Sequence, residues 1–412
     1  MEKQPINMEK QPIVITHNLA ADLRGALAAI SSDRLFVLTD ENTARHCWPL
    51  LAPAFALAQN STSPTSDSIP PSPTSVSTSP SSTSDSTSPS LTSDSTFPSP
   101  TPCPVDGGQS AVPSPHLITI PAGDEAKTLE SLSSVWTALS QGGATRHSLL
   151  LNLGGGMVTD LGGFAASTFK RGIAFINLPT TLLAMVDASV GGKTGINFCG
   201  LKNEIGVFRN ASTVFLDTQF LHTLDRPNLL SGYAEMLKHG LISDHQHLTK
   251  LLQFDILHPD LCLLQQLVEH SVTVKEGIVL QDPQEHGLRK ALNLGHTVGH
   301  AFESHALATH HPVLHGFAVA WGLVCELYLS VKRFNFPRDI FYELQSFVRD
   351  HYGRFPLDCR DYDRLYELMT HDKKNTAGVV NFTLLGDVGD IRINQIATKE
   401  EVFNMLDYYR EN

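Results

Sequence analysis

The chain has 412 residues, of which 41% are hydrophobic, and its 42 Asp and Glu outnumber 30 Lys and Arg to give a formal net charge of −12. At roughly 150 residues per domain, this length predicts two or three domains with substantial cores. The acidic balance argues against a general nucleic-acid-binding protein, because phosphate backbones are bound by clustered basic side chains. No apolar run reaches the roughly 18 residues that a membrane-spanning helix needs, so we expect no membrane partner.

The N-terminus and the cysteines predict a cytoplasmic protein. Residues 1–14 contain a repeated MEKQPI and lack the basic segment and apolar core that are typical of a secretory signal. The six cysteines are scattered and include no CxxC pair. We therefore expect reduced thiols and no catalytic cysteine.

Short apolar strands separated by helices occupy the first half of the chain. Strands are predicted at 34–39 (RLFVLT), 116–120 (HLITI), 148–153 (SLLLNL) and 173–178 (IAFINL). Strands that alternate with helices predict a parallel sheet with its ligand at the carboxyl ends of the strands. We therefore predict an α/β domain over residues 1–224.

Residues from about 60 to 115 are almost entirely Ser, Thr, Pro and Asp. They offer too few apolar side chains to offset an ordering entropy of roughly 1–2 kcal/mol per residue. We predict a disordered insertion that interrupts the α/β domain between two of its strands. A platform for phosphorylation or glycosylation is the alternative to a tolerated insertion, which the small cost of lengthening a loop favours.

From about residue 225 the apolar residues recur at helical spacing. Helices are predicted over 229–241, 261–281, 292–306, 316–334 and 339–352. We predict an all-α second domain over residues 225–412. A site between the two domains is expected, because ligand clefts commonly form there.

Two glycine-rich segments follow the last two predicted strands. In GGGMVTDLGG (154–163), the amides and dipole of a helix start suit a phosphate, although the string is neither GxGxxG nor a Walker A loop. A purely structural turn is the alternative. The second segment, PTTLLAMVDASVGGKTGIN (179–197), is followed by Lys202-Asn203. Its lysines and hydroxyls suit a polyanionic substrate, and a solvated loop is the alternative.

Histidines gather in the helical half of the chain. His296 and His300 are four residues apart on one predicted helix face, and His315 follows. Three histidines with a carboxylate from elsewhere suit a divalent metal, whereas chance clustering is the alternative in a chain with 19 histidines. Spacing alone favours His296 and His300 as paired ligands. We interpret the other histidines nearby as bystanders: His305, His310 and His311.

Taken together, these segments resemble the 3-dehydroquinate synthases, a branch of the sugar phosphate cyclase family. The matching strings run from GGGMVTDLGGFAASTFKRGIAFINLPTTLLAMVDASVGGKTGIN through LKNEIGVF, SGYAEMLKHGLI, GLRKALNLGHTVGHAFE and LHGFAVAWG to HDKKNTAG. The resemblance covers nearly all of the chain outside the N-terminal repeat and the Ser/Thr/Pro-rich insertion. It implies an α/β N-terminal nucleotide-binding domain that binds NAD (1–224) and an all-α C-terminal domain that binds metal and substrate (225–412).

The resemblance also revises the expected metal ligands. It implies one divalent metal, zinc or cobalt, held by the Glu of AEMLK and by the His residues that open GHT and HG. Here these are Glu235, His296 and His315, and His300 becomes a substrate-side group. One carboxylate and two imidazoles leave coordination positions open for substrate oxygens.

Cofactor and substrate contacts are implied residue by residue. The implied NAD contacts follow the predicted strands: Asp40, Asn42, Asp124, Lys127, Gly154, Gly155, Thr159, Asp160, Thr180, Thr181, Leu183, Asp187, Lys193 and Lys202. The implied substrate contacts are Arg171, Lys193, Asn203, Lys238, Lys275, Arg289, Asn293, His300 and one of Lys373 or Lys374. The implied catalytic residues are Lys193, Asn203, Lys238, Arg289, Asn293 and His300.

One departure from the family pattern lies near the implied cofactor site. Most relatives read Gly-Glu-x-x-Lys where this chain has Gly123-Asp124-Glu125-Ala126-Lys127. The shorter carboxylate of Asp124 can still accept ribose hydroxyls. The insertion just upstream is the second departure.

The implied reaction converts 3-deoxy-D-arabino-heptulosonate 7-phosphate to 3-dehydroquinate and phosphate, a step of the shikimate pathway and of aromatic amino acid biosynthesis. The alternatives are another sugar phosphate cyclase, a metal-dependent polyol dehydrogenase, and a binding protein that has kept the fold without the chemistry. Within the resemblance, the intact pattern of Lys275, Arg289 and Leu292-Asn293 favours the dehydroquinate branch over a cyclase whose substrate lacks the carboxylate. A homodimer is expected from the resemblance.

Overall fold

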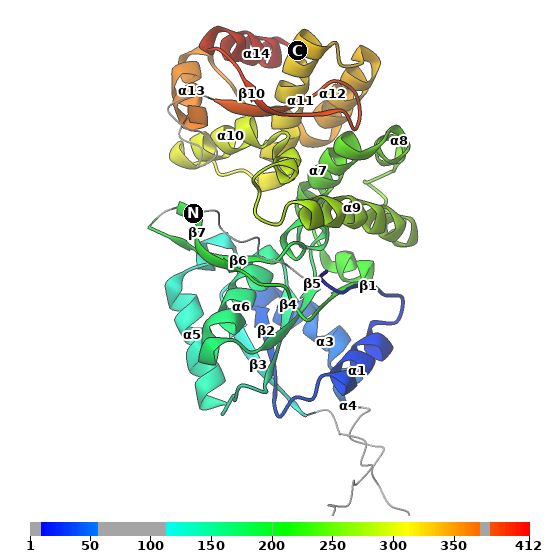
Figure 1. Cartoon of the computed structure of the whole chain (residues 1–412), viewed down its shortest axis with the longest axis vertical. Coiled ribbons are helices and arrows are strands. Elements are labelled where there is room, and N and C mark those ends of the chain that lie inside the picture. The colour runs from blue at the N-terminus through cyan, green and yellow to red at the C-terminus, as the bar shows by residue number, and fades with distance from the viewer. Residues whose placement is uncertain (1–9, 57–112, 200, 371–379) are drawn as a thin grey trace, which may run out of the picture.

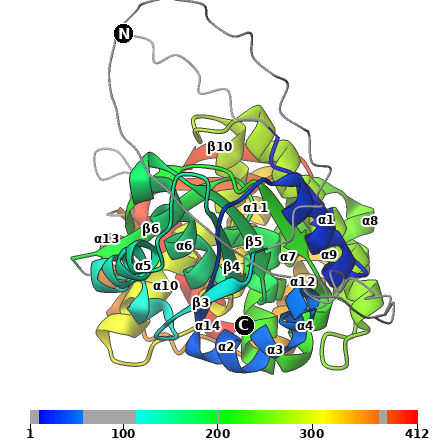
Figure 2. The same cartoon turned by 90° about the horizontal axis from the view of Figure 1, so that it is seen from below.

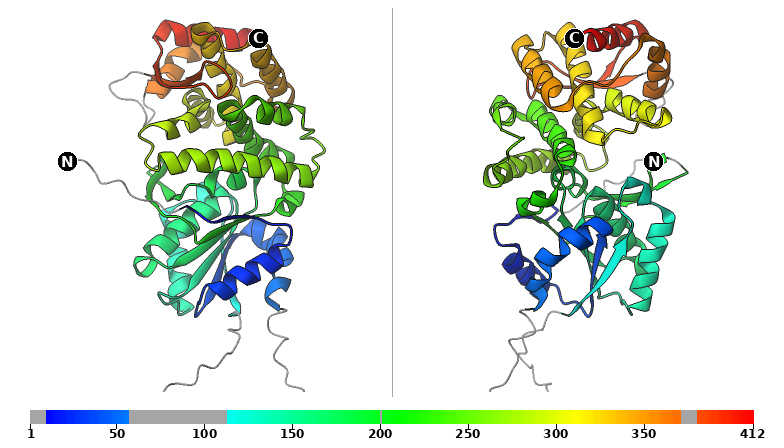
Figure 3. Two further views of the ribbon diagram at one scale, coloured as in Figure 1. Left: turned by 45° about the vertical axis from the view of Figure 1, so that its right-hand side comes forward. Right: turned by 180° about the vertical axis from the view of Figure 1, so that it is seen from behind.

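The computed structural model describes residues 10–56, 113–199, 201–370 and 380–412 (Figure 1). A sheet domain and a helical region lie end to end along the long axis, as the views from other sides also show (Figure 3). Most of the insertion predicted at about 60–115, together with Lys373 and Lys374, lies outside the described residues.

The first domain is built on a six-stranded sheet in which every neighbouring pair is parallel. Its order is β1 (Ile13–Ile15), β8 (Thr213–Leu216), β5 (Ala174–Pro179), β4 (Leu149–Gly154), β2 (Leu35–Asp40) and β3 (Pro115–Ile120). The four predicted strands are confirmed to within one residue at each end. Sequence analysis did not predict β1 and β8, which have only 3 and 4 residues.

The strand order reverses between β2 and β4. The chain adds β3 on one side of β2 and then β4 on the other. Such a reversal opens a crevice at the carboxyl ends of the two strands, where α/β proteins bind ligands. Here β2 ends at Asp40, and β4 ends at Gly154. The last strand before residues 57–112, β2, pairs directly with the first strand after them, β3, so one sheet includes the chain on both sides of this segment.

Helices cover both faces of this sheet, with α5 and α6 on one side and α1 on the other (Figure 2). This explains why every residue of β2 and β4 is buried. The helices are α1 (Leu19–Ala29), α2 (Glu41–His46), α3 (Trp48–Leu51), α4 (Pro53–Ala56), α5 (Leu129–Gln141) and α6 (Gly156–Thr168). An antiparallel hairpin, β6 (Lys193–Phe198) and β7 (Leu201–Phe208), follows a π-helical turn at Ala184–Ala188.

The second half is mostly helical, as predicted. Its helices are α7 (Arg226–Ser243), α8 (His245–Gln253), α9 (Leu261–Gln281), α10 (His296–Ala308), α11 (His315–Phe334), α12 (Arg338–Tyr352), α13 (Tyr362–Thr370) and α14 (Lys399–Glu411). In Figure 1, α7 and α9 lie next to the sheet domain and α10–α14 lie beyond them.

Two details differ from the prediction. An antiparallel pair, β9 (Asn381–Leu385) and β10 (Ile391–Ile396), lies among the helices, so the second half is not all-α. The predicted helix over 292–306 begins only at His296. Residues Leu288–Asn293 form a 3₁₀ turn, and Gly295 has φ +79°, which ends any regular helix there. In the ranges that the structure describes, no helix is long and apolar enough to cross a membrane.

Candidate active site

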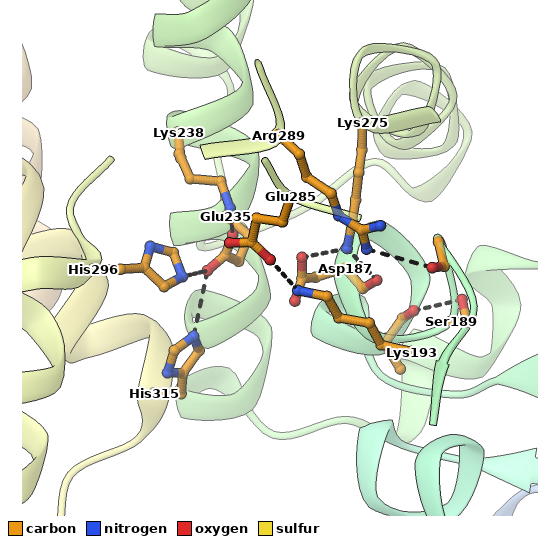
Figure 4. Close-up of polar contacts among 12 residues, drawn as sticks. Asp187, Ser189, Lys193, Glu235, Lys238, Lys275, Glu285, Arg289, His296 and His315 are labelled. Carbon is orange, nitrogen blue, oxygen red and sulfur yellow. Dashed lines mark hydrogen bonds and ion pairs between the residues drawn. The ribbon is translucent and has the colours of Figure 1, made fainter. Parts of the chain in front are cut away.

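Three helices bring the expected metal ligands together (Figure 4). Glu235 lies in the middle of α7, whereas His296 and His315 are the first residues of α10 and α11. Glu235 Oε1 is 3.3 Å from His296 Nε2 and 3.5 Å from His315 Nε2. One donor atom from each side chain lies within 4.8 Å of the others, so one ion could contact all three.

The electrostatics of Glu235 favour a bound cation. The side chain is fully buried and pairs through Oε2 with Lys238, which is also buried. Burial alone would raise the pKa of Glu235, but Lys238 and His296 outweigh it and hold that pKa well below its usual value. Oε1 has no hydrogen-bond partner among the described residues. A divalent cation between Oε1 and the two imidazoles would satisfy this buried oxygen.

A second carboxylate lies behind His315. Glu303, on α10, is 3.5 Å from His315 Nδ1, on the side of the ring away from Glu235. Burial alone would lower the pKa of His315, but the neighbouring carboxylates of Glu235 and Glu303 raise it to about 10. Sequence analysis did not assign Glu303 a role, although it falls three residues after His300, on the same helix face.

His300 lies beside the metal-ligand set. Its ring centroid is 5.3 Å from that of His296 and 5.9 Å from that of His315. His300, Glu303 and His315 form a second group whose donor atoms lie within 4.8 Å of one another. Spacing alone had paired His296 with His300. The structure instead places His296 and His315 on Glu235.

Expected substrate residues line the sheet-domain side of the same site (Figure 4). Lys275, on α9, donates to the backbone oxygen and the carboxylate of Asp187, each at 2.5 Å. Burial alone would raise the pKa of Asp187, but Lys275 holds it below its usual value. Arg289 donates to the backbone oxygens of Pro283 and Gly191. These cations suit a substrate with several negative charges.

Glu285 is a site residue that sequence analysis missed. One carboxylate oxygen is 2.7 Å from Lys193 Nζ, and the other accepts a hydrogen bond of 3.0 Å from the amide nitrogen of Asn293. Glu285 has φ +62°, an uncommon conformation for this residue type. No motif in the sequence signals it, because it lies in an irregular segment between α9 and the next turn.

The expected cofactor residues lie at the crevice of the sheet. Helix α6 starts after Gly155 without a side-chain cap, so its first amides face the crevice and suit a phosphate. Lys127 Nζ is 2.5 Å from both Asp160 Oδ2 and Asn203 Oδ1. Burial raises the pKa of Asp160. Asp40 caps α2 by accepting a hydrogen bond from Thr43, and so also has a structural role.

The remaining expected cofactor residues occupy the same edge of the domain. They follow β2, β4 and β5 or lie on the hairpin: Asn42, Gly154, Thr159, Thr180, Thr181, Leu183, Lys193 and Lys202. Lys202 contacts Asp124 at 3.4 Å and Glu303 at 2.8 Å. It therefore joins the cofactor side of the site to the metal side.

Arg171 is not brought to this cluster. It is exposed and follows α6, whose 13 residues span about 20 Å from the crevice at the other end of the helix. Lys170, Arg171 and Gly172 all have positive φ values, of 49°, 69° and 115°. Within one copy of the chain, Arg171 thus lies away from the other expected substrate residues.

The chain matches known proteins along its length. The N-terminal model of the 3-dehydroquinate synthase family matches residues 117–231, and the C-terminal model matches residues 232–375. A 3-dehydroquinate synthase of Parabacteroides distasonis is 47% identical over 407 residues, which cover 98% of this chain and 99% of that protein.

Solved structures have the same fold. The 2-epi-5-epi-valiolone synthase ValA of Streptomyces hygroscopicus, solved with NAD+ and Zn2+, is 24% identical, with a TM-score of 0.76 over 100% of this chain and 99% of that one. A 2-deoxy-scyllo-inosose synthase, solved with carbaglucose-6-phosphate, NAD+ and Co2+, is 19% identical, with a TM-score of 0.74 over 97% and 96%. The predicted α/β and helical fold is confirmed, and the chain belongs to the 3-dehydroquinate synthase family.

Proposed function

We propose that the chain converts 3-deoxy-D-arabino-heptulosonate 7-phosphate to 3-dehydroquinate and phosphate, with NAD and one divalent metal, zinc or cobalt, as cofactors. This makes it a carbon–oxygen lyase of the shikimate pathway. The observation that carries the proposal is the position of Glu235, His296 and His315 opposite the cations of Lys275 and Arg289. Such a site can hold a metal and a multiply charged sugar phosphate at once.

The residues present fit both cofactors. Glu235 Oε1 is a buried anionic oxygen without a hydrogen-bond partner in the described chain, and it faces two imidazole nitrogens. The uncapped start of α6, after Gly155, offers amides to a pyrophosphate. When bound, NAD accepts and later returns a hydride, and the metal polarises the hydroxyl at the carbon that is oxidised.

Charged side chains hold the substrate at its two ends. Lys193 and Arg171 are the proposed partners of the phosphate, and Lys275 and Arg289 those of the carboxylate. Lys275 and Arg289 are almost fully buried, with exposed fractions of 5% and 2%, so solvent screens them little. Their fixed positions orient the substrate, and a reaction between groups of one molecule is faster when those groups are held in the reactive geometry.

Polar groups between these ends orient hydroxyls and move protons. Asn203, Asn293 and His300 are proposed to hold the ring hydroxyls, with His300 next to the metal ligands. Lys238 keeps Glu235 ionised through the buried ion pair. The phosphate leaves by elimination, for which its own oxygen is the proposed base.

The alternatives differ in substrate and in redox balance. Another cyclase of the family would prefer a sugar phosphate without the carboxylate, and a polyol dehydrogenase would accumulate NADH. The identity of 47% over nearly the full length to a 3-dehydroquinate synthase favours the dehydroquinate reaction.

A substrate comparison tests the proposal. The protein is incubated with NAD and zinc and with each of three compounds, namely the heptulosonate phosphate, sedoheptulose 7-phosphate and glycerol. We expect dehydroquinate and phosphate from the first, in equal amounts, and no net NADH from any of the three. Faster phosphate release from sedoheptulose 7-phosphate would contradict the proposal.

We also propose a cytoplasmic homodimer. Apolar side chains on the β6–β7 hairpin are unusually exposed. The exposed fraction is 41% for Phe198, 49% for Phe208 and 54% for Leu201. A second copy that covers such a face could also supply Arg171 to the substrate. Light scattering on the purified protein gives the mass: twice 45.0 kDa is expected, and a monomer would contradict the dimer.

A further inference from the structure

The two histidines of the proposed metal site share an unusual position, because each is the first residue of its helix. The amides in the first turn of a helix have no partners within the helix, so a side chain usually caps them. Neither Gly295 nor Leu314, the N-cap residues of α10 and α11, provides a side-chain hydrogen bond. The position of each histidine therefore depends on groups from outside its own helix.

Helix α10 is capped by Glu326, which lies on α11. Glu326 Oε2 accepts a hydrogen bond of 2.7 Å from the amide of Gly295, and Oε1 accepts one of 3.2 Å from the amide of Val298. These two amides flank His296 in the sequence. Glu326 is fully buried, so solvent does not compete for these hydrogen bonds.

A cap from within α10 is sterically excluded. Gly295 has φ +79°, and a Cβ atom there would lie 2.8 Å from Leu323 Cδ2 and 3.0 Å from the backbone oxygen of Val319. Any residue with a side chain would clash with α11 at this position. On the other side of the contact, a Cβ on Gly322 would lie 2.0 Å from the oxygen of Gly295. The close approach of the two helices that excludes a local cap also brings Glu326 within reach.

The charge of Glu326 also matters to a metal at this place. The N-termini of α10 and α11 both carry a partial positive charge, which disfavours a cation near His296 and His315. A carboxylate on the amides of α10 offsets that charge. A buried carboxylate is expensive in itself, and an apolar residue would fill the space at lower cost.

We propose that Glu326 is a positioning residue, which holds His296 in the geometry that binds the metal. This inference rests on the metal site of the proposed function. Glu326 acts through the backbone of α10 and contacts neither the substrate nor the metal. Replacing the groups that orient metal ligands typically costs 10–100-fold in metal affinity, and we expect about tenfold here.

The test uses Glu326→Gln, which puts an NH2 group opposite one of the two amides. The dissociation constant for zinc is measured by competition with a chromophoric chelator, and the visible spectrum is recorded with cobalt. We expect about tenfold weaker zinc binding and altered cobalt bands. Glu326→Asp keeps the charge on a shorter side chain, so its zinc affinity should lie between that of Glu326→Gln and that of the wild type. If Glu326→Gln does not fold, Glu326→Asp is compared with the wild type instead.

Ser330→Ala is the matched control. Ser330 is also buried on α11, where its hydroxyl accepts a hydrogen bond from the amide of Leu385 on β9 and donates one to the backbone oxygen of Glu326. Its replacement perturbs the same helix but leaves the carboxylate of Glu326 in place. The Ser330 variant and the Glu326 variants are all expected to have a lower unfolding temperature than the wild type. Only the Glu326 variants are expected to bind zinc more weakly. Equal zinc affinity in Glu326→Gln and Ser330→Ala would overturn the positioning role. A wild-type protein that binds neither zinc nor cobalt would overturn the metal site itself, which is a different result.

Discussion

Lys202 Nζ is 2.8 Å from Glu303 Oε1, and this ion pair joins the β6–β7 hairpin of the sheet domain to α10 of the helical region. On one side Lys202 reaches Asp124, at 3.4 Å, and on the other Glu303 reaches His315 Nδ1, at 3.5 Å. Alternating charges thus connect the proposed cofactor site to a proposed metal ligand.

We expect Lys202→Met to weaken both NAD binding and substrate binding. Partly exposed ion pairs contribute about 0.2–1 kcal/mol each, so the loss of two, expressed in full in NAD binding, predicts a rise of about 2–30-fold in the dissociation constant for NAD. A fluorescence titration with NAD measures it, and the difference from wild type should shrink at high salt. Lys250→Met, an exposed lysine on α8, is the control. An unchanged constant in Lys202→Met would contradict this link.

Zinc affinity should rise with pH. The pKa of His315 is raised to about 10, so in the metal-free protein a proton occupies this imidazole at neutral pH. Zinc must displace that proton, which predicts a dissociation constant that falls about tenfold per pH unit. The stability of the metal-free protein should change in the opposite direction and fall as the pH rises. Pairing of the charged His315 stabilises it fully below the ordinary pKa of 6.5, and this contribution is lost as the pH rises toward 10.

Zinc titrations at several pH values, with unfolding curves of the metal-free protein, check both trends. Glu303→Gln removes one of the two carboxylates that raise the pKa of His315, and so both trends should end at a lower pH. A zinc affinity that does not vary with pH would contradict the protonation state assigned to His315.

Replacing Glu235 should separate metal binding from stability. Glu235→Gln leaves the cation of Lys238 buried and unpaired, at an exposed fraction of 1%, which predicts a loss of about 3–5 kcal/mol in the free energy of unfolding. Zinc binding should also be lost. The double variant Glu235→Gln/Lys238→Met should recover much of the stability without recovering zinc binding.

Urea unfolding and zinc competition measure the two effects in the same preparations. Recovery of zinc binding in the double variant would argue against Glu235 as a ligand. A double variant as unstable as the single one would argue against the ion pair as the cause.

Glu285 should compete with phosphate for Lys193. The ion pair of 2.7 Å occupies a cation that the proposed function assigns to the substrate phosphate. Glu285→Gln removes the charge but can still accept the hydrogen bond of Asn293. We expect inorganic phosphate, as a competitive inhibitor, to bind several-fold more tightly to this variant. Equal inhibition constants would show that Glu285 does not limit access to Lys193.

Much of the fold could be predicted from local patterns. The strands of the sheet core, β2 and β4, are mainly apolar runs that end at Asp40 and Gly154, and helix α9 matches its predicted bounds, Leu261–Gln281. The short edge strand β1 and the pair β9–β10 were missed, because their pairing depends on distant segments and few residues carry the pattern.

The site was predictable only in part, because distant segments build it. Spacing within one helix suggested His296 with His300, whereas His315 and Glu235 come from two other helices. Glu285 and Glu326 lie in no motif. Their contacts arise from an irregular backbone and from the close crossing of α10 and α11, which no single segment of sequence encodes.

The central claim is a redox-neutral cyclisation that needs the metal at Glu235, His296 and His315. The most direct test measures phosphate release from the heptulosonate phosphate, together with NADH absorbance, before chelation, after chelation and after zinc is restored. We predict that release stops on chelation and returns with zinc, with no NADH accumulating at any stage. Release that continues in the chelated protein, or NADH formed in proportion to phosphate, would contradict the account.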